Sequence, residues 1–569
     1  MPKKINYDNW TQQQLIDEIE VLRKQKTYGL VWETDKTKEI FDYYINWDGS
    51  QVKEKFGKQE GKFPVLREIA DKSIENDNSE YNIMIEGDNY HSLAVLNFTH
   101  KKAIDVIYID PPYNTGAKNW KYNNNFVEKD DAYRHSKWLN FMEKRLKLAK
   151  NLLKKDGVLI CAIDENEMWR LGCLLEEIFF DYETHLVTIV HNPKGVQGKN
   201  FSYINEFAFF VIPKGQKIIG DRKLKDEEIY WSNLRNWGNE SLRSDARNCF
   251  YPIITDGNQI IGFGDVASND FHPTRQTDKK DGLYYVYPID IQGVERKWRY
   301  AKQSVESIKN FLKVKKNKDR IEIEIGKNYG TVRTVWQSPN YDASEYGTKL
   351  VNALVPNSSF DFPKSIYTVY DCIYPILSNR KNATVLDFFA GSGTTGHAVL
   401  LLNKEDGGSR NYILCTNNEN GIAEDVCFPR MKAVIEGNKK YSEITGIKSS
   451  LKYFQTDFVD AIHTDENKKR IVSKSTEMLC VKENAFESVT EKKTYKIFRN
   501  NKLNIGIIFD DDAINDFIAE AKNIKGKFNV YVFSLDESVP SFEFKELRDR
   551  IKLCPIPEVI LHVYRRIFK

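Results

Sequence analysis

The sequence lacks several patterns that would narrow the class of protein at once. None of its 8 cysteines stands in a Cys-x-x-Cys pair, so neither a zinc site nor a disulfide framework is indicated, and we expect no metal. No apolar run is long enough to span a bilayer, and the polar amino terminus has no signal-peptide core, which favours a cytoplasmic protein without a membrane partner. The 84 basic and 81 acidic residues leave a net charge of only +3, so any nucleic-acid footprint must be local.

What the sequence does contain is an α/β rhythm in two separate stretches. Its 569 residues favour three or more domains. Residues 81–213 alternate short apolar strands, such as 104–109, with helices, and the rhythm returns in 347–458 with a strand at 383–388. This alternation predicts an α/β fold with a doubly wound, parallel, Rossmann-like sheet that is encoded in two pieces.

Three further segments flank or interrupt this sheet. Residues 1–80 are predicted as a helical arm and a connection, because apolar residues recur at helical spacing over 11–26. Residues 214–346 break the rhythm and contain only short apolar runs. Residues 459–569 are predicted as a small C-terminal α/β domain.

The insert at 214–346 carries the local basic clusters of the chain. Basic and aromatic residues interleave at 296–299, and Lys315, Lys316 and Lys318 follow. Such a mixture suits contact with a nucleic-acid backbone and with bases, although a run of charges is also typical of a solvated surface.

The first motif with chemical content is Asp110-Pro111-Pro112-Tyr113, which directly follows the apolar strand 104–109. The carboxyl end of a strand is where open α/β sheets bind ligands. The carboxylate of Asp110 and the carbonyl of Pro111 can accept the two N–H bonds of an exocyclic amine, and consecutive prolines preorganise that carbonyl. Tyr113 offers a face on which an extruded base can stack. The motif therefore predicts direct group transfer to a ring amine, without a covalent intermediate.

The second motif is a glycine-rich turn between the strand 383–388 and a helix. It begins at Asp387 and comprises Phe389, Ala390, Gly391, Ser392, Gly393 and Thr394. The glycines permit a close approach of the backbone to a ligand, and the start of the helix favours a carboxylate or a phosphate. Because the turn lacks the lysine of a phosphate-binding P-loop, a methionine-type ligand with one carboxylate fits it better than a nucleotide does.

Together the two motifs resemble the amino-methyltransferases of DNA. The catalytic motif precedes the cofactor loop with an insert between them, an order that resembles the beta class, in which the sheet is circularly permuted and 214–346 would be the target-recognition domain. Similarity extends to the modification subunits of Type III restriction-modification systems. It is carried by the segments 28–33, 86–89, 360–365 and 556–569.

This resemblance implies S-adenosylmethionine as the cofactor and the N6 amine of a flipped adenine in double-stranded DNA as the acceptor. It also implies a homodimer and a separate restriction subunit with helicase and nuclease activity. Three alternatives stay open: cytosine-N4 methylation, a solitary methyltransferase, and a subunit whose main task is to deliver a nuclease-helicase partner to DNA.

The resemblance also implies further cofactor residues. Asp88 and Asn89 should lie near the cofactor and Lys364 near its carboxylate, although Asp88 also suits a helix cap and Lys364 a solvated helix start. The acidic residue that usually holds the ribose is replaced by a threonine here, so ribose contact passes to Asn417 or Glu419.

Overall fold

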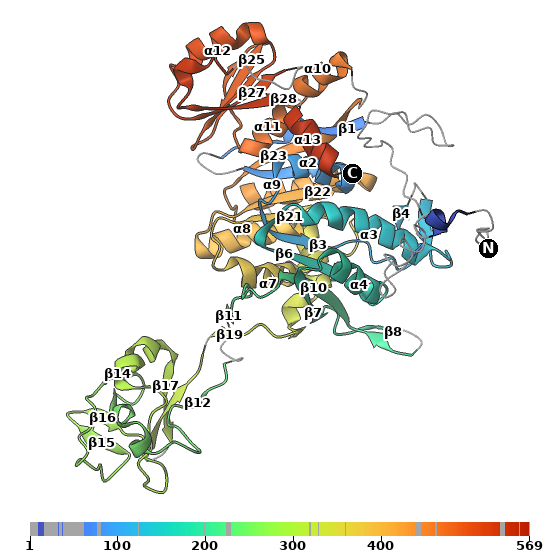
Figure 1. Ribbon diagram of the computed structural model, residues 1–569. Helices are drawn as coiled ribbons and strands as arrows, with labels where there is room; N and C mark the ends of the chain where they lie inside the picture. Colours follow the sequence, from blue (N-terminus) through green and yellow to red (C-terminus); the bar gives the residue numbers. More distant parts are fainter. Residues whose placement is uncertain are drawn as a thin grey trace. The chain divides into compact units, whose positions relative to one another are not determined.

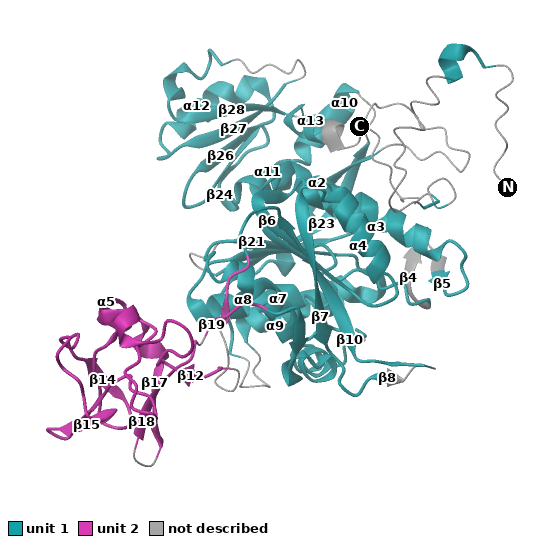
Figure 2. Ribbon diagram, turned by 60° about the horizontal axis from the view of Figure 1, so that its bottom comes forward, with its two compact units in different colours: residues 1–218, 333–569 teal, residues 219–332 magenta. Residues whose placement is uncertain are grey.

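Figure 1 shows the chain as a computed structural model. The structure describes residues 10–15, 32–33, 37, 62–76, 81–122, 125–197, 200–223, 229–317, 320–327, 329–358, 360–437, 445–460, 464–534, 541–556 and 558–567. Most of the helix predicted over 11–26 and most of the segment 28–33 lie outside these residues. The chain divides into two compact units, of which the larger comprises 1–218 with 333–569 and the smaller 219–332 (Figure 2).

The larger unit is built on one 10-stranded sheet. In spatial order its strands are β1 (Lys62–Glu68), β23 (Ser450–Asp460), β2 (Tyr81–Glu86), β22 (Asn411–Thr416), β21 (Thr384–Asp387), β3 (Ile104–Ile109), β6 (Leu153–Ile163), β10 (Asn205–Pro213), β7 (Tyr182–Val190) and β20 (Val335–Gln337). The strands from β23 to β6 all run parallel. The central part of the sheet therefore confirms the predicted doubly wound arrangement, with the two stretches of sequence interleaved in one sheet.

Toward its two edges the sheet is not parallel, and there the prediction was wrong. β10 runs antiparallel to both β6 and β7, and β1 runs antiparallel to β23. The described residues between β7 and β10 contain no helix. A parallel return needs a long crossover, usually a helix, so a connection without one leads naturally to antiparallel pairing.

Helices cover both faces of this sheet (Figure 1). The helices α2, α3 and α4 pack in succession on one face, and α7, α8 and α9 on the other. Their bounds are α2 (Asn89–Thr99), α3 (Arg134–Lys150), α4 (Met168–Ile178), α7 (Ile366–Leu377), α8 (Thr394–Asp406) and α9 (Phe428–Glu436). Among the described residues, no helix combines the length and the apolar character needed to cross a membrane.

The order of the strands reverses between β3 and β21. From β3 the chain continues through α3 to β6 on one side, and from β21 it continues through α8 to β22 on the other. Because such crossovers are right-handed, opposite directions place α3 and α8 on opposite faces. A crevice results beyond the carboxyl ends of β3 and β21, at the switch point where open α/β sheets bind ligands.

The segment 459–569, predicted as a C-terminal domain and called so below, belongs to the larger unit but has a sheet of its own. Its order is β24-β25-β26-β27-β28, with β26, β27 and β28 parallel. Two of its helices, α11 and α13, pack against α2 of the large sheet. The elements are α10 (Asp465–Ser473), α11 (Thr476–Glu483), β24 (Glu487–Glu491), β25 (Tyr495–Arg499), β26 (Asn504–Ile508), α12 (Ile514–Ala521), β27 (Phe528–Phe533), β28 (Ile551–Ile556) and α13 (Glu558–Ile567).

The smaller unit lies within the predicted insert 214–346 and has its own hydrophobic core. Its two main sheets have the orders β14-β13-β16-β15 and β12-β18-β17. The strands are β12 (Ser232–Asn233), β13 (Ile253–Thr255), β14 (Ile260–Phe263), β15 (Thr277–Lys280), β16 (Leu283–Val286), β17 (Leu312–Asn317) and β18 (Arg320–Ile325). Trp298, within the basic-aromatic cluster 296–299, is a core residue that donates to the Tyr251 carbonyl at 2.8 Å. Its ring therefore supports the fold and is not exposed to a base.

Candidate active site

The Asp-Pro-Pro-Tyr turn at 110–113 follows directly on β3, and every residue of that strand is buried. Buried Trp138 of α3 donates a hydrogen bond of 2.6 Å from its indole Nε1 to the carbonyl oxygen of Pro112. Asn114, the next residue after the turn, has a φ of 57°, a left-handed conformation that asparagine tolerates better than most residues. The indole contact and the two prolines hold the turn in one shape at the crevice.

Beside this turn, four polar side chains that are distant in sequence meet. The Nζ atom of Lys364 lies 2.7 Å from Oε2 of Glu206 and 3.3 Å from Oδ1 of Asp110. The same ammonium donates a hydrogen bond to the Tyr113 hydroxyl and lies 4.5 Å from the centre of its ring. The Tyr113 hydroxyl in turn donates to Oε2 of Glu206 at 3.4 Å. Lys364 is thus held between two carboxylates and over the ring that ends the motif.

The charges in this cluster depend on one another. Burial raises the pKa of Asp110, and the neighbouring Lys364 works against that rise. For Lys364, burial lowers the pKa, but Asp110 and Glu206 outweigh burial and hold it above its ordinary value, so the side chain is an ammonium at neutral pH. Burial, with the same two carboxylates, raises the pKa of Tyr113, which therefore keeps its proton. A buried cation is what allows negative charge to persist at Asp110.

Glu206 is the residue of this cluster that the sequence did not reveal. It lies in β10, where only 4% of its surface is exposed. The strand reads Asn-Glu-Phe-Ala-Phe-Phe, so a lone acidic residue at its start looks like an edge residue that faces solvent. The one available sign of its role was an acidic residue beside an apolar run. Such a residue can be buried, and a buried carboxylate needs a partner. That partner, Lys364, comes from the other of the two stretches of sequence that build the sheet.

The glycine-rich turn connects β21 to α8 and requires its glycines. Gly391 and Gly393 have φ values of 50° and 80°, a region that other residues rarely adopt. A Cβ atom at Gly393 would lie 3.1 Å from the sulfur of Cys427, and one at Gly391 would lie 3.0 Å from the ring of Phe360. The turn is therefore closely packed at both glycines.

A buried arginine in α9, Arg430, fixes this turn through two hydroxyl groups. Its Nη1 atom donates to the hydroxyl of Ser392 at 2.9 Å and to the hydroxyl of Thr394 at 2.8 Å. Burial lowers the pKa of Arg430 to about 10, so it is still charged at neutral pH. The sequence predicts a helix here but gives no sign that this arginine points inward, since arginine is usually exposed.

Asp387 anchors the beginning of the turn. Its carboxylate accepts hydrogen bonds from the backbone N–H of Phe389 at 2.9 Å and from the hydroxyl of Thr395 at 2.5 Å. Burial nevertheless raises the pKa of Asp387 to about 7. Asp387 therefore ties the end of β21 to the first turn of α8, and it titrates close to neutral pH.

One pocket connects the two motifs. Its lining comprises Tyr108, Asp110, Phe360, Phe362, Pro363, Lys364, Val369, Asp387, Phe389, Ala390, Gly391, Ser392, Thr394 and Thr395. Aromatic rings from 360, 362 and 389 suit a flat ring, and the start of α8 suits a carboxylate. These features fit a methionine-type ligand that carries a heterocyclic base, with Asp110 at the same pocket to receive a second molecule.

The other predicted cofactor residues lie at the same edge of the sheet but do not line this pocket. Asp88 caps α2 by accepting from the N–H of Tyr90 at 2.7 Å, and 45% of its side chain is exposed. Asn89 donates to the Phe388 carbonyl at 3.0 Å, which links α2 to the glycine-rich turn. Asn417 is exposed just after β22. Their contact with a cofactor stays a prediction.

The fold and this pocket define a Rossmann-like methyltransferase, and comparison with known proteins gives the family. A family model described as "DNA methylase" matches residues 104–446, more than half of the chain, and the chain belongs to that N6/N4 DNA methylase family. The chain is 31% identical over 396 residues to the Type II methyltransferase M.KpnI of Klebsiella pneumoniae. This match covers 66% of the chain and 88% of that protein.

Further similarity is to a subunit of a restriction-modification enzyme. The chain is 28% identical over 439 residues to the Type III restriction-modification enzyme EcoPI Mod subunit of Escherichia phage P1, a match that covers 68% of the chain. It spans 65% of the length of that relative. Among solved structures, a putative DNA modification methylase of Thermus thermophilus in complex with S-adenosyl-L-methionine is 10% identical, with a TM-score of 0.30 and coverage of 65% and 97% of the two chains.

Proposed function

We propose that this chain transfers a methyl group from S-adenosylmethionine to the N6 amine of an adenine in double-stranded DNA. The observation that carries the proposal is the shared pocket, because Asp110 and the glycine-rich turn line the same cavity although they lie in different halves of the sequence. One motif can therefore position an acceptor amine while the other holds the donor of the methyl group.

The acceptor amine is a weak nucleophile, and the turn at 110–113 improves it. Oδ1 of Asp110 lies 3.3 Å from the Lys364 ammonium, and among the described residues it has no other polar partner, so it can accept a hydrogen bond from an amine. The Pro111 carbonyl accepts the second N–H, which leaves the nitrogen lone pair directed away from both acceptors. Tyr113 offers its ring to a base that has left the DNA stack.

Lys364 and Glu206 control the charge at Asp110 in this proposal. Bound S-adenosylmethionine supplies an electrophilic methyl group, and the amine loses one proton after transfer. The ammonium of Lys364 keeps Asp110 ionised before the amine binds. Because Lys364 also pairs with Glu206, its ion pair with Asp110 is weaker, and the oxygens of Asp110 stay available to the amine. We therefore assign Lys364 to the acceptor side of the pocket rather than to the cofactor carboxylate.

The cofactor residues of the proposal follow the geometry of the pocket. The backbone of 389–394 holds the methionine part at the start of α8, with Asp387 behind it. Asp88 and Asn89 complete the edge beside this turn, and Asn417 or Glu419 contacts the ribose. No metal takes part in this scheme, because amine alkylation by a sulfonium needs no Lewis acid.

The proposed biological setting is a Type III restriction-modification system. Support comes from similarity to the EcoPI Mod subunit, although the chain spans 65% of that protein. In this setting the chain is the modification and specificity subunit, acts as a homodimer on duplex DNA, and associates with a restriction subunit that has helicase and nuclease activity. The compact unit 219–332 is the proposed target-recognition domain.

A transfer assay tests the proposed reaction. Full-length protein is incubated with S-adenosylmethionine labelled in the methyl group and with duplexes of varied sequence, and the digested nucleosides are separated by mass. The proposal expects label in N6-methyladenine and only in duplexes that contain the recognition site. Label confined to cytosine, or transfer to RNA alone, would overturn it.

A further inference from the structure

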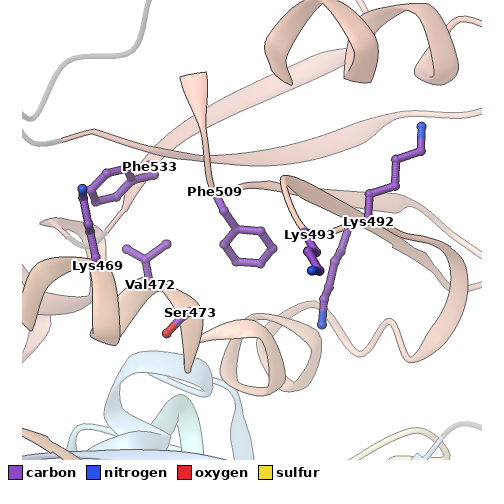
Figure 3. A pocket seen from close by; sticks show the side chains of 8 residues that line it. Lys469, Val472, Ser473, Lys492, Lys493, Phe509 and Phe533 are labelled. Atoms are coloured by element: carbon purple, nitrogen blue, oxygen red, sulfur yellow. The ribbon is translucent and has the colours of Figure 1, made fainter. Parts of the chain in front are cut away.

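A second pocket lies in the C-terminal domain, and the charged residues in its lining all carry one sign (Figure 3). Its lining comprises Lys469, Val472, Ser473, Lys492, Lys493, Lys496, Phe509 and Phe533. Half of these residues are lysines, and no acidic side chain is among them. The methyl-transfer scheme uses none of them, so the pocket calls for a separate explanation.

Four separate segments build this pocket. Helix α10 contributes one wall, and the turn between β24 and β25 contributes Lys492 and Lys493. Phe509 directly follows β26, and Phe533 ends β27, so both rings lie at the carboxyl ends of neighbouring parallel strands. That edge of an open α/β sheet is the usual location of a ligand site.

Two of the four lysines lack a carboxylate of their own. Lys492 lies 3.0 Å from Glu520, and Lys496 lies 4.0 Å from Glu491. Lys469 and Lys493 are exposed and form no ion pair within the described part of the chain. Gathered cations repel one another, and an anionic ligand would relieve that repulsion.

The acidic run that follows Phe509 does not neutralise the pocket. Asp510 is turned to its own backbone, where its carboxylate accepts from the N–H of Asp512 at 3.2 Å and caps the short helix that begins there. The triplet Asp510–Asp512 is also absent from the pocket lining. The positive charge of the lysines that line the pocket is therefore available to attract an anionic ligand.

The arrangement of the side chains indicates what fits. In Figure 3 the ring of Phe509 lies in the middle, with Lys469 beside Phe533 on one side and Lys492 and Lys493 on the other. A base can stack on an aromatic ring, and lysines on both sides suit the two phosphates that flank one nucleotide of a strand. A free mononucleotide has phosphate on one side only, so the lysines on the other side of Phe509 would lack an anionic partner.

We propose that this pocket binds a nucleotide unit of a single nucleic-acid strand, with the base against Phe509 and the flanking phosphates at Lys469 and Lys493. It gives the C-terminal domain a strand-binding function of its own, independent of the recognition site. The inference goes beyond methyl transfer and does not depend on it.

Binding of fluorescein-labelled oligo(dT) to the full-length protein, followed by anisotropy, tests this proposal. Oligo(dT) contains no adenine, so failure of the methylation proposal leaves this test intact. The double variant K469A/K493A should bind at least about fivefold more weakly, and the slope of log affinity against log salt should fall by roughly 1.4, because each phosphate that a lysine neutralises on a single strand contributes about 0.7.

A charge-matched control lies at the opposite edge of the same sheet. Lys525 and Lys527 precede the amino end of β27, and K525A/K527A should leave binding unchanged. The variant F509L keeps an apolar side chain but removes the stacking face, and it should weaken binding by about tenfold. Equal weakening by both double variants, or unchanged binding in K469A/K493A and F509L, would overturn the proposal. So would displacement of the strand by dTMP at an equal concentration of nucleotide.

Discussion

The ammonium of Lys364 lies 2.7 Å from Glu206 and 3.3 Å from Asp110, so a residue of β10 determines how firmly the lysine holds the proposed catalytic carboxylate. Glu206 itself has no direct path to the acceptor amine in the proposed scheme. Its effect passes through Lys364 and Tyr113, which makes it a positioning residue. A positioning residue should change the rate of transfer without changing the affinity for the cofactor.

The variant E206Q tests that distinction. Glutamine keeps the size of the side chain but removes its charge, so Lys364 should pair more tightly with Asp110 and compete with the amine for its oxygens. We expect kcat for methyl transfer to fall by at least about tenfold, with the cofactor Kd within about twofold of the original, since one charge-assisted hydrogen bond is altered. Single-turnover assays and calorimetry measure the two quantities.

The matched control for E206Q is E466Q, since Glu466 lies on α10 with 80% of its side chain exposed. That change should leave both quantities unaltered. A parallel rise of the cofactor Kd in E206Q would place the Lys364–Glu206 pair at the cofactor instead. An unchanged kcat would remove Glu206 from the site altogether.

The glycine-rich turn provides a second prediction through G393A. A methyl group there would meet the sulfur of Cys427 at 3.1 Å and must also accept a φ of 80°. The turn should shift, and cofactor affinity should fall by about tenfold or more, because the backbone can no longer approach the ligand closely. The control is G407A at the end of α8, where φ is 68° but no atom lies within 4 Å of the added carbon. If G407A weakens cofactor binding as much as G393A does, backbone strain alone explains the loss.

The raised pKa of Asp387 should make the stability of the protein depend on pH. Its pKa is raised by burial to about 7 in the folded protein, against about 3.9 in an unfolded chain. Between those values the folded state binds more protons than the unfolded state, so the contribution of Asp387 to stability is present at acidic pH and is lost as pH rises toward 7. The melting temperature of the original protein relative to D387N should therefore fall between about pH 4 and pH 7. Parallel melting curves for the two proteins across this range would contradict the assignment.

The target-recognition role of the smaller unit is tested on β17. Lys315 and Lys316 lie on the exposed part of this strand, with Lys315 paired to Glu324 at 2.8 Å, whereas Lys318 lies outside the described residues. If the strand binds duplex DNA, K315A/K316A should weaken binding and reduce the salt slope by about 0.9 for each phosphate that is no longer neutralised. The K525A/K527A variant is the control. Unchanged binding in K315A/K316A would move the DNA surface elsewhere.

The sequence predicts best where burial and periodicity coincide. The strand at 104–109 and the helix at 366–377 have the predicted bounds, because a largely apolar strand and clear helical spacing leave few alternatives. It predicts least well where strands carry many charges. Most of the C-terminal sheet and β1 were not predicted, since strands such as 487–491, with one valine among charged and hydroxyl residues, resemble a loop.

The same limit applies to the site. The two motifs could be predicted because each is a contiguous run of residues whose types and spacing indicate a chemical function without knowledge of the fold. Glu206 and Arg430 were not, because each owes its function to a partner from a distant segment. That Lys364 lies near the cofactor carboxylate rested on resemblance and stays a prediction, whereas its place between Asp110 and Glu206 is seen only in the structure. Such pairings arise only when the two halves of the sheet assemble.

Single-molecule sequencing of DNA from cells that express the chain is the decisive test of adenine methylation, since it reports base, site and strand together. We expect N6-methyladenine at one short sequence, and no such mark in cells that express D110A, although the purified variant should still bind S-adenosylmethionine. N4-methylcytosine as the only new mark, or undiminished methylation by D110A, would contradict it.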